Sequence, residues 1–197
     1  MRLRQAVPVA ARRVARVHAH GVSGARGGEE LLGGAGWGVN VLGIDPGKDG
    51  GAVILRGREV LASVRVASLI GSAKWHTGGG DAVADWLRAA HAENRIDLAV
   101  LELFAGRPME GRGSAMTTGV GWGIWYGALR GLGIAVLTPT SATWTKALFV
   151  GIQGEGKERS VAYCRRFLPD LDLVPKGCRK PQDGLADAGC LAAWGGA

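Results

Sequence analysis

A glutamate interrupts one of the most apolar segments of the chain. Glu102 lies in the run Leu-Ala-Val-Leu-Glu-Leu-Phe over residues 98–104, which has the composition of a buried strand. A buried carboxylate without a partner is costly, so such a group protonates, pairs with a cation or ligates a metal ion. The alternative is a strand-edge glutamate whose side chain faces water. The segment therefore predicts either a functional carboxylate or a solvated strand edge.

Further acidic residues stand where the local pattern is apolar. Asp45 ends the apolar run 39–45 just before a Pro-Gly turn, where a turn-forming aspartate is the alternative interpretation. Asp183 and Asp187 are four residues apart near the end of the chain, a spacing that puts their Cβ atoms about 5–6 Å apart on one helix face. Asp183 also suits the positive end of a helix dipole, and Asp187 suits a solvated helix face.

The composition favours an intracellular protein with one folded domain. The chain has 197 residues, of which 47% are hydrophobic, enough for a real core. No apolar run approaches the roughly 18–20 residues that span a membrane, so we expect no membrane partner. The three cysteines, Cys164, Cys178 and Cys190, are odd in number and form no CxxC pair. This pattern favours reduced thiols over disulfides or a zinc site.

The net charge of +7 is concentrated at the N-terminus. Residues 1–28 carry six arginines and no acid, so the rest of the chain has a net charge of only +1. We expect residues 1–38 to be a basic, Gly-rich, disordered extension and residues 39–197 to form the domain. The extension is compatible with a non-structural addition, a DNA-contacting arm or a targeting segment, because it superficially resembles a mitochondrial transit peptide.

Periodicity and turn residues predict a mixed sheet with flanking helices. The expected strands are 39–45, 51–55, 60–66, 97–104 and 133–138. The expected helices are 82–91, 119–132, 141–148, 157–168 and 182–194, and 105–113 is expected to be a polar loop. Three closely spaced strands favour an antiparallel meander, and crossovers imply that the last two strands are parallel. This order is the ribonuclease-H-like plan, an α/β fold with a five-stranded mixed sheet.

In such a sheet the acidic residues can converge. The first and fourth strands can lie side by side, which brings Asp45 to Glu102, and docking of the last helix would add Asp183 and Asp187. Four hard oxygen ligands suit Mg²⁺ or Mn²⁺. Two such ions about 4 Å apart can activate a water and stabilise the leaving oxygen in phosphodiester hydrolysis. The four carboxylates are therefore the candidate catalytic and metal-binding residues.

These segments resemble a known family. The segments 41–52 (VLGIDPGKDGGA), 101–104 (LELF) and 182–192 (QDGLADAGCLA) resemble the three acidic motifs of RuvC-like Holliday junction resolvases. The segments 138–146, 157–160 and 167–169 are similar to the bacteriophage-type branch, and the resemblance covers about residues 39–194. One difference concerns the last motif, because Gly184 stands where many cellular members have an acid or histidine three residues before the final aspartate.

The resemblance implies a Mg²⁺-dependent homodimer that cuts two opposed strands of a four-way DNA junction. Two cuts in a nearly two-fold symmetric junction suit a two-fold symmetric protein. It also implies the cytoplasm of a bacterial or phage-infected cell, with the mitochondrion as the alternative. The segment 43–48 (GIDPGK) leaves an actin-like ATPase or sugar kinase open as a second function, although the chain is short for two such lobes. A third possible function is that of a non-catalytic, ribonuclease-H-like DNA-binding protein.

Basic residues suggest where DNA would bind. Residues 146–180 contain eight bases and four acids, which favours phosphate contact over an ordinary solvated helix face. Lys157 could stabilise phosphate charge near the metals and is a candidate catalytic residue. Phe104 could insert among unstacked bases or belong to the core. The candidate DNA-binding residues are Lys48, Phe104, Arg107, Arg112, Lys146, Arg159, Arg179 and Lys180.

Overall fold

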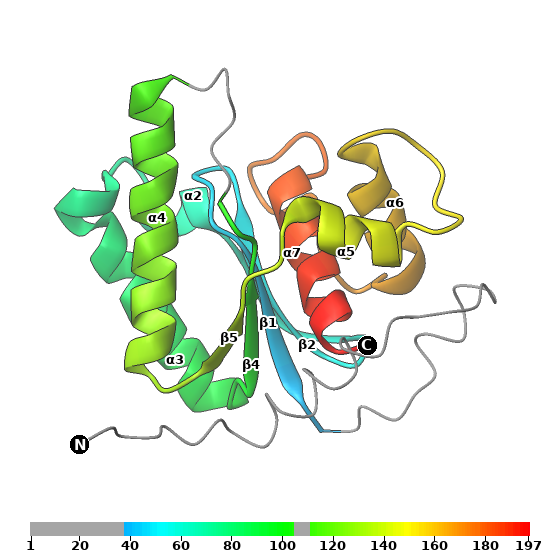
Figure 1. The fold of residues 1–197 in the computed structure, drawn as a ribbon, viewed down its shortest axis with the longest axis horizontal. Helices are drawn as coiled ribbons and strands as arrows, with labels where there is room; N and C mark the ends of the chain where they lie inside the picture. The colour runs from blue at the N-terminus through cyan, green and yellow to red at the C-terminus, as the bar shows by residue number, and fades with distance from the viewer. Residues whose placement is uncertain (1–37, 105–110) are drawn as a thin grey trace.

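A computed structural model describes residues 38–104 and 111–197 (Figure 1). Its five-stranded sheet has the order β3-β2-β1-β4-β5. The strands are β1 (Asn40–Asp45), β2 (Gly51–Arg56), β3 (Glu59–Arg65), β4 (Leu98–Leu101) and β5 (Ala135–Leu137). The first three strands pair antiparallel, and β1, β4 and β5 pair parallel. The predicted mixed sheet is thus confirmed, whereas the domain boundary at residue 38 stays a prediction.

Helices cover both faces of the sheet (Figure 1). One face carries α2 (Val66–Ile70), η2 (Trp75–Gly79), α3 (Gly80–Asn94) and α4 (Arg112–Gly131), and the other carries α5 (Ser141–Leu148), α6 (Glu158–Phe167) and α7 (Asp183–Gly195). Because side chains alternate along a strand, Leu42 and Ile44 of β1 enter the core beneath α3 and α4, whereas Val41 enters the core beneath α7. No helix in the described parts of the chain is long and apolar enough to cross a membrane.

Glycines let the last helix lie directly on the sheet. A Cβ at Gly43 of β1 would lie 2.0 Å from the carbonyl oxygen of Ala188 in α7. A Cβ at Gly184 would lie 2.3 Å from the carbonyl oxygen of Asp49. No side chain fits at either position without moving the backbone. The absence of an acid at residue 184 is therefore required by the packing of α7 against the β1–β2 turn.

The structure corrects several predicted element boundaries. α4 begins at Arg112 rather than at residue 119, because the glycines that weakened the helical pattern do not prevent a helix packed against the core. β4 ends at Leu101 rather than at residue 104, although the backbone N–H of Leu103 still donates to the carbonyl of Pro139 at 2.8 Å. α2 and η2 were not predicted, because each is only five residues long and shows no helical period.

Candidate active site

Strand pairing brings Asp45 and Glu102 together at one edge of the sheet. Ile44 of β1 is paired with Leu101 of β4, so the next residue of each strand is an acid. The backbone N–H of Glu102 donates to the carbonyl of Ile44 at 3.1 Å, which continues this pairing past the end of β4. The carboxyl ends of two parallel strands therefore place these two carboxylates side by side, as the sequence predicted.

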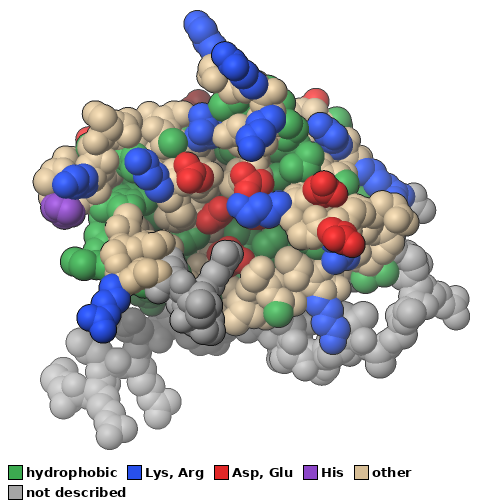
Figure 2. Space-filling view, turned by 90° about the horizontal axis from the view of Figure 1, so that it is seen from above, with side chains coloured by type: hydrophobic (Ala, Val, Ile, Leu, Met, Phe, Trp, Pro, Cys, Tyr) green, Lys and Arg blue, Asp and Glu red, His purple; other side chains and the backbone are tan. Residues whose placement is uncertain are grey.

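A cavity of about 580 Å³ opens at this edge. Three acids line it, Asp45, Glu102 and Asp187, together with Lys157 and Ser160 of the α6 region. Aromatic and hydroxyl side chains also line it, namely Phe104, Thr118, Thr140, Ser141, Trp144, Thr145 and Phe149. The rest of the lining is Pro46, Gly47, Leu103, Gly156 and Arg159. Figure 2 views the molecule from this end, and acidic side chains gather near its centre with lysine and arginine side chains among and around them.

The environment of Asp45 and Asp187 disfavours their charged forms. Burial, with repulsion from Asp187 and Glu102, raises the pKa of Asp45 to about 7, although the backbone N–H of Gly47 donates to its Oδ1 at 3.2 Å. Burial, with repulsion from Glu102, raises the pKa of Asp187 to about 6 despite the hydrogen bond from Ser160. Each carboxylate therefore lacks enough neighbouring positive charge to offset its burial.

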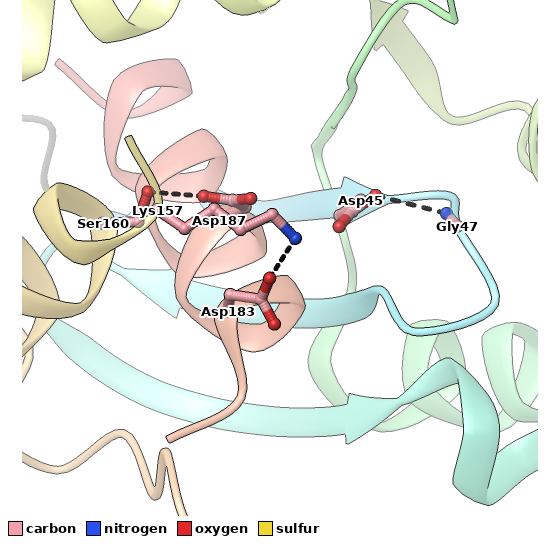
Figure 3. Close-up of polar contacts among 6 residues, drawn as sticks. All are labelled: Asp45, Gly47, Lys157, Ser160, Asp183 and Asp187. Atoms are coloured by element: carbon pink, nitrogen blue, oxygen red, sulfur yellow. Dashed lines mark hydrogen bonds and ion pairs between the residues drawn. The ribbon is translucent and has the colours of Figure 1, made fainter. Parts of the chain in front are cut away.

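Asp183 stands apart from the other three acids because it is paired with Lys157. The Lys157 ammonium donates to Oδ2 of Asp183, and Figure 3 shows this pair beside Asp187 on α7. Burial opposes ionisation of Asp183, but the hydrogen bond and charge of Lys157 prevail and lower its pKa. The same hydrogen bond raises the pKa of Lys157. Asp183 is the first residue of α7, with Gln182 as the N-cap, so it also lies at the positive end of the helix dipole.

The donor chemistry of this site fits a hard divalent cation. The acids of the cavity offer carboxylate oxygens, which Mg²⁺ and Mn²⁺ prefer, and the raised pKa values of Asp45 and Asp187 show carboxylates in need of positive charge. Within residues 38–104 and 111–197, no three His, Cys, Asp or Glu side chains are already close enough to ligate one ion. Binding would therefore require the carboxylates to draw together.

If Asp183 is a metal ligand, Asp183→Asn is expected to slow DNA cleavage strongly. The free energy of unfolding should fall by at most about 1 kcal/mol, because the lost ion pair is exposed. The measurements are the cleavage rate in Mg²⁺ and Mn²⁺ and the melting temperature. Asp85→Asn is the matched control, since Asp85 forms an exposed ion pair with Arg88 at 2.7 Å on α3. Near-normal cutting with a lowered melting temperature would mean that Asp183 has a structural role. The metal site would then consist of three carboxylates.

The predicted DNA-binding residues occupy different environments. Five are exposed: Lys48 in the β1–β2 turn, Arg112 at the start of α4, Lys146 on α5, and Arg179 and Lys180 before α7. Phe104 is partly buried and lines the cavity. Arg159 also lines it, but its guanidinium donates to the carbonyl of Phe149 at 2.6 Å and lies 4.9 Å from the centre of that ring. Arg107 lies outside the described residues.

Three further residues contact the acids without having been predicted to do so. Trp144 donates its indole N–H to Oε1 of Glu102 at 3.1 Å, and Trp122 donates to the backbone carbonyl of Glu102 at 3.0 Å. Ser160 is 2% exposed and donates to Oδ1 of Asp187. Ser160 belongs to the segment 157–160 that carried part of the family resemblance. Nothing in the spacing of the tryptophans pointed to Glu102.

Solved structures share this fold. RuvC of Thermus thermophilus in complex with a Holliday junction substrate matches with a TM-score of 0.55 and 17% identity, over 79% of this chain and 91% of that one. A second Thermus thermophilus RuvC structure matches with a TM-score of 0.52 and 19% identity, over 79% and 92%. The yeast mitochondrial Holliday junction resolvase Ydc2 matches with a TM-score of 0.50 and 15% identity, over 94% and 91%.

Sequence comparison adds no closer relationship. No protein-family model matches the chain, and no curated protein matches it. These three structures are of bacterial and yeast mitochondrial proteins, so similarity to the bacteriophage-type branch stays a prediction. At these identities the likeness concerns the fold. The chain has the ribonuclease-H-like fold of these solved resolvases.

Proposed function

We propose that this chain is a crossover-junction endodeoxyribonuclease, a metal-dependent enzyme that resolves four-way DNA junctions by paired phosphodiester hydrolysis. The observation that carries the proposal is the convergence of Asp45, Glu102 and Asp187 on one cavity beside Lys157. These acids come from two adjacent strand ends and a helix laid on the sheet. The match to a RuvC structure solved with its junction substrate supports the assignment.

The metal would be held by Asp45, Glu102 and Asp187, with Asp183 as the fourth candidate ligand. We propose Mg²⁺, two ions per site, with Mn²⁺ as a substitute, because the donors are carboxylate oxygens. When bound, divalent ions of this kind polarise phosphoryl oxygens and lower the pKa of a bound water. The need of Asp45 and Asp187 for nearby positive charge supports this assignment.

The chain's own residues would place the scissile phosphate. The Lys157 ammonium reaches the cavity and can approach an anionic phosphate there, and its pair with Asp183 holds it in place. Ser160 fixes one oxygen of Asp187 and so orients that carboxylate. The exposed Lys48, Arg179 and Lys180 are proposed to bind the DNA backbone outside the cavity.

The proposed partners are branched DNA and a second copy of the chain. Two cuts on opposed strands need two active sites, and a two-fold dimer supplies them on a nearly two-fold symmetric junction. We propose that α4 contributes to the dimer contact, because Met116 is 73% exposed and Tyr126 is 39% exposed on this helix. All three cysteines are free thiols, which supports a reducing compartment, the cytoplasm or alternatively the mitochondrion.

The test compares a labelled four-way junction with a linear duplex of the same arm sequence, each with and without Mg²⁺. We expect paired nicks in opposed strands of the junction, only with metal, and little cutting of the duplex. Junction binding without cutting at any Mg²⁺ or Mn²⁺ concentration would favour the non-catalytic DNA-binding alternative. No observation on the described residues favours the ATPase or sugar-kinase alternative, which predicts nucleotide turnover instead.

A further inference from the structure

Two indole N–H groups from different helices donate to the same acid. Trp144 of α5 donates to Oε1 of the Glu102 carboxylate at 3.1 Å, and Trp122 of α4 donates to the Glu102 backbone carbonyl at 3.0 Å. An indole nitrogen only donates, so an oxygen of Glu102 is the acceptor in both bonds. Glu102 is therefore held at its main chain by one helix and at its side chain by another.

Trp144 is fixed so firmly that it can restrain the carboxylate. Its side chain is 2% exposed, and its ring packs edge-on against Phe149 with 5.5 Å between the ring centres. If Glu102 rotated away, the buried indole N–H would lose its hydrogen-bond partner, which is unfavourable for a buried donor. The hydrogen bond engages Oε1 of the carboxylate, and no residue within 38–104 and 111–197 donates to its second oxygen.

A restraint of this kind matters because the acids of the cavity repel one another. The negative charge of Glu102 helps to raise the pKa of both Asp45 and Asp187. Without a tether, a flexible glutamate would lower this repulsion by turning toward solvent, since it is partly exposed. The Trp144 hydrogen bond opposes that rotation and keeps Glu102 with the two aspartates.

We propose that Trp144 is a positioning residue that keeps the Glu102 carboxylate at the cavity, from which it can draw together with Asp45 and Asp187 on a shared divalent cation. The inference rests on the proposed function, because it concerns the same site. Ligating carboxylates are themselves hydrogen-bonded in metal sites, and loss of such a partner typically costs about 10–100-fold in metal affinity or activity. Trp144 acts through Glu102 and supplies no chemistry of its own.

The test is Trp144→Phe, which keeps an aromatic ring against Phe149 and removes only the N–H donor and part of the ring. We expect the Mg²⁺ concentration for half-maximal cleavage to rise about 10–100-fold. The Mn²⁺ concentration that half-maximally raises the melting temperature should rise by a similar factor, without any DNA present. Excess metal should restore cleavage, and junction binding in EDTA should match the wild type.

Trp125→Phe is the matched control for loss of a buried indole. Trp125 is fully buried on α4, and its N–H has no hydrogen-bond partner among the described residues. Its replacement should lower stability but leave both metal midpoints unchanged. If Trp144→Phe gives the same metal midpoints as Trp125→Phe, the positioning role is wrong. If the positioning role is wrong but wild-type protein still cuts junctions, the proposed function stands.

A spectroscopic measurement covers the case in which Trp144→Phe does not fold. In wild-type protein with ¹⁵N-labelled tryptophan, the indole N–H signal assigned to Trp144 should move on addition of Mg²⁺ and should also be displaced by Glu102→Gln. If the Trp144 signal does not respond to both changes, the inference is overturned. If such a signal is present but the protein does not cut junctions, the positioning role is supported and the proposed nuclease function is wrong.

Discussion

Glu102→Gln protein is expected to bind four-way junctions as the wild type does and to cut them at least about 10³-fold more slowly in Mg²⁺. Glutamine keeps the size of the side chain and the oxygen that accepts from Trp144, but it removes the negative charge. A metal-assisted step derives several kcal/mol from charge stabilisation, and each 1.36 kcal/mol is about tenfold in rate. Binding should persist because affinity for DNA comes mainly from phosphate contacts, which we propose to lie mostly outside the cavity.

The comparison needs the rate and the affinity from the same preparation. Cleavage is followed under single-turnover conditions in Mg²⁺, and binding by mobility shift in EDTA. Glu93→Gln, an exposed residue on α3 away from the cavity, is the matched control and should cut normally. Asp187→Asn should behave like Glu102→Gln, since both acids line the same cavity. A Glu102→Gln protein that cuts at the wild-type rate would refute the assignment of Glu102.

The sheet and the nearness of two acids were predictable from local patterns. Asp45 and Glu102 each follow an apolar strand, and the crossover rule makes those strands parallel. Parallel strands end at the same edge, so the nearness of the two carboxylates follows from topology without any side-chain detail. The helical spacing of Asp183 and Asp187 was equally readable, because both lie on α7 as predicted.

The side-chain contacts of the site were not predictable in the same way. The bonds Lys157–Asp183, Ser160–Asp187 and Trp144–Glu102 join residues 26, 27 and 42 positions apart in the chain. Such contacts depend on how α5, α6 and α7 pack against one another, which hydrophobic periodicity does not specify. In particular, Asp183 pairs with Lys157, which sets it apart from Asp45, Glu102 and Asp187. The sequence spacing had grouped all four acids together.

The packing of α7 shows how the fold positions the acids at a cost in stability. Gly43 and Gly184 let this helix approach the sheet more closely than any side chain would allow. That approach places Asp187 beside Asp45 and Glu102, whose charges repel it in the metal-free protein. A fold selected for stability alone would not bury these carboxylates together. The arrangement therefore favours binding of a cation, and its cost can be measured.

Asp45→Asn should stabilise the metal-free protein at pH 8 while abolishing cleavage. The pKa of Asp45 is raised to about 7 from an ordinary value of 3.8, so the folded state prefers the protonated form. Such a group favours folding fully below pH 4, and this contribution is lost as the pH rises to about 7. Asp187, with a pKa of about 6, acts in the same direction. Metal-free wild-type protein should therefore be less stable at pH 8 than at pH 5.

The expected size follows from the shift at Asp45. Three pKa units at 1.36 kcal/mol each correspond to roughly 4 kcal/mol, or on the order of 10 °C in melting temperature for a chain of this length. Asparagine is neutral at every pH and can still accept from the backbone N–H of Gly47. The variant should thus melt higher than the wild type at pH 8 in EDTA and vary less between pH 5 and pH 8.

Asp172→Asn is the control that isolates burial as the cause. Asp172 also accepts from a backbone N–H two residues ahead, that of Val174 at 2.9 Å, but it is exposed. Its replacement should change the melting temperature little at either pH. Mg²⁺ should raise the melting temperature of wild-type protein at pH 8 and have a smaller effect on Asp45→Asn, because the cation neutralises the charge that the variant lacks. Equal melting temperatures for wild type and Asp45→Asn at pH 8 in EDTA would mean that Asp45 is well solvated and needs no cation.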